Sequence, residues 1–209
     1  MMRLNVHLYC KMIMTDSLSQ SEHKIVKGWY SAAEKCESPH FDLREHCLPK
    51  DISLLVIHNI SLPAGEFGGP YITDLFLGQL DKHAHASFNE IYQLRVSAHC
   101  LIRRDGHIIQ YVSFDHRAWH AGVSEYQGKS KCNDFSIGIE LEGTDNTPYT
   151  DEQYFRLAEL TKVLKSNYQR INANITGHCD IAPERKTDPG PAFDWQRYKS
   201  LLNLSTRVI

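Results

Sequence analysis

Two histidines and an aspartate of this 209-residue chain are of the residue types that commonly bind zinc. His58 follows a continuous apolar run at 54–57, at the point where a Gly/Pro-rich segment begins, and strand ends that meet loops often carry functional groups. His178 follows a second apparent strand end, and Asp188 precedes a proline, which favours extended backbone. Two neutral imidazoles and one carboxylate would leave a bound Zn²⁺ with a net positive charge and an open position for water. Spacing alone does not bring these distant residues together, and His58 could equally be a core histidine with one hydrogen bond.

Two further charged residues could act on a substrate at such a metal. Residues 135–141 alternate between apolar and small or polar side chains, which places Glu140 on the polar side of a strand. A carboxylate there could be a general base or a solvated surface group, and Glu142 on the same side could equally be such a surface group. Lys186 lies two residues before Asp188, so both side chains point to the same side of an extended segment.

Most of the twelve histidines have no pattern that indicates chemistry. His83 and His85 form an H-x-H pair in a polar segment, which is a weak metal signal. His116 and His120 are four residues apart but lack the H-E-x-x-H pattern. We therefore expect neither pair to bind a metal.

Hydrophobic periodicity and turn signals predict the elements that position these residues. Strands are expected at 54–57, 95–103, 107–112 and 135–141, with a hairpin turn at Asp105-Gly106. A short helix is expected at 72–80, and a longer one through Tyr168 begins at a capping box formed by Thr150 and Gln153. Residues 171–177 should form a short strand or loop, and Asp194 should cap a terminal helix through about residue 202. This mixture predicts an α/β (mixed α+β) fold, with a central sheet covered by helices.

Composition bounds the partners and the compartment. The net charge of -2 and the pI of about 6.6 leave no broad basic field, so a nucleic-acid partner is not expected. No apolar run reaches the ~18–20 residues that a membrane span needs. Residues 1–24 are expected to be a poorly ordered N-terminal extension and do not resemble an export signal. The six cysteines lack C-x-x-C spacing, so we expect reduced thiols in a cytoplasmic protein.

Five stretches of the chain resemble a known enzyme family. They occur in the family's order and cover about residues 25–203: LLVIHNISLPAGEFGGP (54–70), LRVSAHCLIRRDGHIIQYV (94–112), RAWHAGVSEYQGK (117–129), CNDFSIGIELEGTD (132–145) and GHCDIAPERKTDPGPAFDW (177–195). The family is the cytoplasmic N-acetylmuramoyl-L-alanine amidases of the AmpD type, which act on 1,6-anhydro-muropeptides in peptidoglycan recycling. The resemblance implies a single amidase domain at 25–205 with a central mixed β-sheet flanked by helices, a fold shared with peptidoglycan recognition proteins.

The resemblance also implies roles for individual residues. The family's metal ligands fall on His58, His178 and Asp188, its catalytic glutamate on Glu140 and its catalytic lysine on Lys186. One Zn²⁺ per chain and a small muropeptide substrate are implied, with no nucleic acid or membrane partner, for a protein that we expect to be a monomer. The family's substrate contacts fall on Asn59, Arg95, Trp119, Tyr126 and Lys131. Lys131 stands where an Arg is expected, and a lysine keeps the charge but loses the bidentate fork.

Three alternatives remain open at this stage. Some proteins with this fold bind peptidoglycan without cutting it, although the presence of the complete ligand set favours an enzyme. An exported amidase acting on intact peptidoglycan is a second alternative. A purely structural zinc is the third, although three ligands with an adjacent Glu and Lys suit an open catalytic site better.

Overall fold

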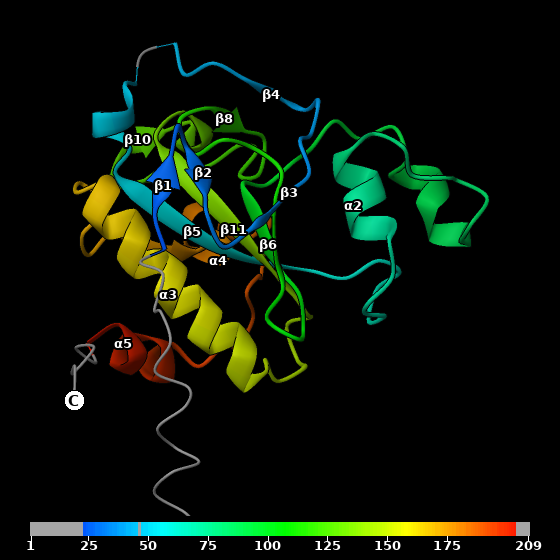
Figure 1. Ribbon diagram of the computed structural model, residues 1–209. Coiled ribbons are helices and arrows are strands. Elements are labelled where there is room, and N and C mark those ends of the chain that lie inside the picture. The colour runs from blue at the N-terminus through cyan, green and yellow to red at the C-terminus, as the bar shows by residue number, and fades with distance from the viewer. Residues whose placement is uncertain (1–22, 46, 204–209) are drawn as a thin grey trace, which may run out of the picture.

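The protein is built around one mixed β-sheet with helices on it, as Figure 1 shows. The computed structural model describes residues 23–45 and 47–203. The sheet has six strands in the order β12-β5-β11-β6-β7-β3. Their bounds are β3 Glu34–Lys35, β5 Leu54–Ile60, β6 Cys100–Ile102, β7 Ile108–Gln110, β11 Ser136–Glu142 and β12 Ile175–Gly177. The strands β12, β5, β11 and β6 are parallel, whereas β6 and β7 form an antiparallel hairpin. This confirms the predicted central mixed sheet.

The two longest strands, β5 and β11, lie side by side in the middle of the sheet. Their parallel register pairs Ile57 with Ile139 and His58 with Glu140. All seven residues of β11 are buried, because β5 and β6 flank it and other segments cover both of its faces. The strand predicted at 135–141 is therefore confirmed, and its polar side is buried within the protein.

Helices pack around this sheet. Helix α3, Asp151–Asn167, crosses in front of the sheet in Figure 1, and α5, Trp195–Asn203, packs against α3. The predicted capping box is confirmed, because Thr150 accepts from the Gln153 backbone and Gln153 accepts from the Thr150 backbone. The predicted cap at Asp194 is confirmed by the 2.8 Å hydrogen bond from the Arg197 backbone to Asp194 Oδ1.

The hydrophobic interior has two parts. The larger cluster joins β5 and β11 to α3 and α5, with Leu54, Ile137 and Leu160 fully buried. The second cluster lies between β6–β7 and helix α2, Tyr71–Phe76, together with the 3₁₀ turn η2, Ala86–Glu90. Burial of apolar side chains on both sides of the sheet holds the central strands in place.

Several short elements complete the fold. They are β1 Ile25–Val26, β2 Trp29–Tyr30, β4 Phe41–Asp42, η1 Pro49–Asp51, β8 Arg117–Ala118, β9 Glu125–Tyr126, β10 Lys129–Ser130, η3 Cys132–Asp134 and α4 His178–Ile181. The expected strand at 95–103 is only Cys100–Ile102, and the expected helix at 72–80 ends at Phe76. Most of the predicted extension at 1–24 lies outside the described residues, so the domain boundary at 25 stays a prediction.

The described part of the chain also bears on the expectations about membrane spans and cysteine thiols. None of the helices between residues 23 and 203 has the length and apolar character that a bilayer crossing demands. The five described cysteines, Cys36, Cys47, Cys100, Cys132 and Cys179, are free thiols.

Candidate metal centre

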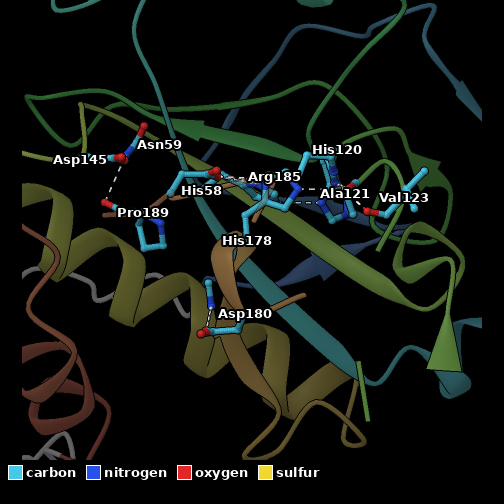
Figure 2. A network of polar contacts seen from close by, with 12 residues as sticks. His58, Asn59, His120, Ala121, Val123, Asp145, His178, Asp180, Arg185 and Pro189 are labelled. Carbon is cyan, nitrogen blue, oxygen red and sulfur yellow. Dashed lines mark hydrogen bonds and ion pairs between the residues drawn. The ribbon is translucent and has the colours of Figure 1, made fainter. Parts of the chain in front are cut away.

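His58, His178 and Asp188 converge on one point, although 120 and 10 residues separate them in the chain. The Nδ1 atoms of the two histidines are 3.0 Å apart. Asp188 Oδ2 lies 3.0 Å from His58 Nδ1 and 3.1 Å from His178 Nδ1. These three atoms form the one group of three or more His, Cys, Asp or Glu ligand atoms that could hold a metal ion among the described residues. Figure 2 shows His58 and His178 facing each other at this centre.

Adjacent parallel strands bring the ligands to one end of the sheet. Strand β5 carries His58, and β12 pairs with β5 through Gly177 and Ile57. His178 comes directly after β12 as the first residue of α4. The prediction that His178 follows a strand end is confirmed, whereas His58 lies inside β5, which continues to Ile60. Asp188 is held near His178 because the Cys179 backbone N–H donates a 2.9 Å hydrogen bond to the Asp188 carbonyl oxygen.

The hydrogen bonds behind the two histidines determine what their Nδ1 atoms can do. His178 Nε2 lies 3.1 Å from the Ala121 carbonyl oxygen, which can only accept, so Nε2 carries the proton. His58 Nε2 lies 2.9 Å from His120 Nδ1. With protons on both Nε2 atoms, two Nδ1 lone pairs and a carboxylate oxygen converge, an arrangement that a cation stabilises.

The spacing of these atoms supports a small metal ion. A tetrahedral zinc site with bonds of 2.0–2.1 Å separates its donor atoms by about 3.3 Å. The observed spacings of 3.0–3.1 Å are close to this value. The donor set of two imidazole nitrogens and one carboxylate oxygen is also one that zinc accepts.

The ligands are in protonation states that suit metal binding. Burial lowers the pKa of His58 to about 4, against the opposing effect of the Asp188 carboxylate, so this ring is neutral at pH 7. Burial alone would raise the pKa of Asp188, but the His178 and His58 rings, within 3.1 Å of its Oδ2, hold the pKa below its ordinary value. The site therefore presents a neutral His58 imidazole and an ionised Asp188 carboxylate.

Glu140 stands beside His58 on the neighbouring strand. Its side chain is 9% exposed, and Oε2 has no hydrogen-bond partner among the described residues. Burial raises the pKa of Glu140 well above its ordinary value, the Asp188 charge adds to this, and Lys186 opposes it. A buried carboxyl group with a raised pKa and a free oxygen is suited to take up and release a proton.

Glu142, the alternative candidate, has a different role. It is 1% exposed, and its Oε1 accepts a 2.7 Å hydrogen bond from the Gly68 backbone. Its Oε2 accepts one of 3.1 Å from the Arg104 backbone, and Arg103 forms an ion pair with it. Glu142 therefore anchors the segment after β5, and neither glutamate is the solvated group that the sequence left open.

Asn59 holds the loop that carries Asp188. Its Nδ2 donates to Asp145 Oδ1 at 2.8 Å and to the Pro189 carbonyl at 3.1 Å, as Figure 2 shows. The next residue, Gly190, has a φ of +77°, and a Cβ there would lie 2.2 Å from Asp145 Cα. This close approach and the amide of Asn59 both fix the backbone beside the ligand.

The other predicted substrate residues are described by their local contacts. Arg95 is exposed, and its guanidinium lies over the Trp119 ring at 5.5 Å, so these two form one surface. Lys131 is exposed and lines a cavity of about 470 Å³ with Arg117 and Asn133. Tyr126 is half-buried, and its hydroxyl lies 3.5 Å from Asn174 Oδ1. Geometry alone assigns no substrate contact to any of them.

Lys186 is also exposed, on the segment between α4 and Asp188. It lies close enough to His58 and Glu140 to contribute to lowering the pKa of both groups. The structure therefore brings together the five residues predicted to act on metal and substrate.

Sequence reasoning missed the segment at His120-Ala121. His120 contacts His58, and the Ala121 carbonyl accepts from His178 and, at 2.7 Å, from Arg185, a group of contacts that Figure 2 shows. A signal was present in the polar side of β11, where Ser136 and Gly138 precede Glu140. Small residues on the face that carries a buried glutamate leave room for another side chain.

Comparisons with known proteins show which proteins this chain resembles. The family model described as N-acetylmuramoyl-L-alanine amidase matches residues 48–191. A protein of Salmonella typhimurium (strain SL1344), described as 1,6-anhydro-N-acetylmuramyl-L-alanine amidase AmpD, is 63% identical over 182 residues, which is 86% of this chain and 95% of that relative. The protein of the same description from Escherichia coli (strain K12) is 62% identical, over 86% of this chain and 97% of that relative. A crystal structure of a selenomethionine derivative of AmpD matches with a TM-score of 0.83 and 61% identity, over 85% of this chain and 98% of that chain.

Proposed function

Because this chain belongs to the N-acetylmuramoyl-L-alanine amidase family, we propose that it hydrolyses the amide bond between the lactyl group of 1,6-anhydro-N-acetylmuramic acid and L-alanine in muropeptides. The proposal is carried by the convergence of two imidazole lone pairs and a carboxylate beside Glu140, whose Oε2 has no partner in the described part of the chain. The anhydro substrate is favoured because relatives more than 60% identical over nearly their whole length carry that activity in their description.

One Zn²⁺ per chain would be held by His58, His178 and Asp188. Bound there, zinc supplies Lewis-acid chemistry for water and for an amide carbonyl. Three protein ligands leave a coordination position for the reactants, which distinguishes a catalytic site from a closed structural one. Both histidine side chains are buried. The contacts of their Nε2 atoms, with His120 and with the Ala121 carbonyl, keep the ligand orientation fixed while a substrate binds.

Glu140 is the proton carrier of the proposed reaction. It accepts a proton from the attacking water and delivers it to the nitrogen of the leaving L-alanine. Burial raises its pKa above that of an ordinary glutamate, which suits the uptake and release of a proton, and the nearby Lys186 charge opposes part of this rise. The rigid β5–β11 pairing sets the position of this carboxyl group relative to His58.

Lys186 stabilises the negative charge that develops on the carbonyl oxygen in the tetrahedral intermediate. Its exposed ammonium can reach a bound substrate from the solvent side of the centre. One such donor contributes about 2.7–4 kcal/mol of transition-state stabilisation.

Substrate contacts, location and assembly complete the proposal. The surface formed by Arg95 and Trp119 offers an aromatic ring and a cation to a sugar or a carboxylate. Tyr126, Lys131 and the oxygen of the Asn59 amide are the further candidate contacts. We expect a monomer that acts in the cytoplasm, where free thiols such as those observed persist.

The substrate is tested by comparing two digests with the purified, zinc-loaded protein. One contains intact sacculi and the other contains anhydro-muropeptide, and released peptide is quantified in both. The proposal predicts release from the anhydro-muropeptide and little from sacculi. Strong release from sacculi would favour an amidase for intact peptidoglycan, and binding of either without release would favour a binding module.

A further inference from the structure

His120 lies behind His58, on the side opposite the atoms that converge on the metal. His120 Nδ1 is 2.9 Å from His58 Nε2, and His120 Nε2 is 3.1 Å from Ser136 Oγ. The rings of His58 and His120 meet edge to face, with 5.0 Å between their centroids and 84° between their planes. The three side chains form one chain of contacts that runs from β11 to the metal centre.

The ring protons along this chain of contacts can be arranged in two ways. If His120 Nδ1 holds the proton, it donates to His58 Nε2, and the remaining proton of neutral His58 then occupies Nδ1 and blocks metal binding. If His120 Nδ1 is free, it accepts from His58 Nε2, and His58 Nδ1 becomes a ligand. In the second case His120 donates from Nε2 to Ser136 Oγ.

We propose that His120, supported by Ser136, is a positioning residue that holds His58 in the form that binds metal through Nδ1. The inference rests on the proposed function, because it requires a metal on His58 Nδ1. It adds a residue that touches neither the metal nor the substrate.

The surroundings of His120 are built to hold its ring in this place. A Cβ at Gly138 would lie 2.4 Å from His120 Cγ and Nδ1, so the ring packs directly on the bare backbone of β11. The backbone N–H groups of His120 and Ala121 both donate to Asn133 Oδ1, at 3.2 Å and 2.8 Å. The backbone of β11 therefore stops the ring from moving toward the strand, and the hydrogen bonds to Asn133 stop the segment that carries the ring from moving away.

The same segment supports both ligand histidines. The His120 side chain accepts from His58, and the next residue supplies the Ala121 carbonyl that accepts from His178 Nε2. Asn133 fixes the two residues together through one side-chain oxygen. One short segment thus sets the orientation of both imidazole ligands.

A pair of variants of equal shape tests the role of His120. In His120→Asn the side-chain oxygen can accept from His58 in place of Nδ1, whereas His120→Leu has the same shape without an acceptor. Both variants lose the contact with Ser136 and leave a similar cavity, so a purely structural role affects both equally. Zinc affinity is measured by competition with a chelator of known affinity. We expect His120→Leu to bind zinc about 10- to 100-fold more weakly than wild type, the usual cost of losing such support, and His120→Asn to retain most of the affinity.

A second measurement uses the wild-type protein and does not depend on either variant folding. Two-bond ¹H–¹⁵N spectra of the histidine rings report which nitrogen carries the proton. In the zinc-loaded protein we expect the proton of both His58 and His120 on Nε2. Equal zinc affinity of the Asn and Leu variants, or a proton on His120 Nδ1, would overturn the role of His120 while zinc binding by wild type stands. A wild-type protein that binds no zinc would overturn the metal centre itself.

Discussion

Glu140→Gln should stabilise the metal-free protein while removing its activity. The substitution keeps the size of the side chain and removes a carboxyl group that is buried, with one oxygen unpartnered, next to Asp188. Functional groups held in such surroundings lower the stability of the fold, so their replacement commonly raises it. The same carboxyl group that we propose as the proton carrier is therefore a cost to folding.

The size and the pH dependence of this effect follow from burial. An unsatisfied buried polar group costs about 1–3 kcal/mol, and more when it is charged. Because the folded pKa of Glu140 is raised, its contribution to stability is fully present below the ordinary pKa of about 4.3. It is lost as the pH rises through the raised folded pKa. The difference in unfolding free energy between Glu140→Gln and wild type should thus be near zero around pH 4 and grow to at least about 1 kcal/mol above the folded pKa.

Urea unfolding of the metal-free proteins at a series of pH values measures this difference. Glu142→Gln is the matched control, because Glu142 is the same residue type on the same strand and is also buried, but it accepts from Gly68 and Arg104. That variant should be destabilised. A Glu140→Gln protein that is no more stable than wild type at any pH, or whose advantage shrinks as the pH rises, would refute the reasoning.

Three other substitutions give distinct outcomes. Lys186→Ala should keep zinc and lose about 10²–10³-fold in kcat, because an exposed lysine contributes little to the fold but supplies a donor to the oxyanion; wild-type turnover would remove Lys186 from the mechanism. Gly138→Ala should weaken zinc binding in chelator competition, because its Cβ displaces the His120 ring; unchanged affinity would contradict the packing argument. Asn59→Asp should lower the unfolding free energy by about 1–3 kcal/mol, because a carboxylate would face Asp145 and the Pro189 carbonyl without a donor. A higher KM at unchanged stability would instead make Asn59 a substrate contact alone.

Individual elements of the fold could be predicted from the sequence, because local signals mark them. The apolar run before His58 and the capping box at Thr150 are properties of neighbouring residues, and both elements are present. The convergence of His58, His178 and Asp188 has no local signal, since it depends on the order of β12, β5 and β11 in the sheet. At the sequence level only the resemblance to a family placed these three residues together.

The environment of β11 shows what the alternation of residues along a strand does not settle. Its apolar side packs in the main core, whereas its polar side faces other protein groups instead of solvent. Ser136 Oγ lies within hydrogen-bond distance of the His120 ring, and Gly138 leaves room for the same ring. Glu140 pairs with His58 of the neighbouring strand. Alternation predicts which residues share a face, but it does not say whether that face meets water or a site.

His120 escaped prediction because its role depends on a contact between segments 62 residues apart. The sequence spacing raised only the question of whether His120 binds a metal itself. In the structure its ring contacts the ligand His58 instead. Residues that support ligands rather than bind the metal have no fixed spacing from them, so a sequence motif does not reveal them.

The central claim is that His58, His178 and Asp188 hold a zinc ion required for cleavage of anhydro-muropeptide. Metal analysis of the purified protein, combined with an amidase assay before chelation, after chelation and after addition of zinc, tests it most directly. We expect about one zinc per chain, loss of peptide release when the metal is removed, and recovery when zinc is restored. Undiminished cleavage by the metal-free protein would contradict it.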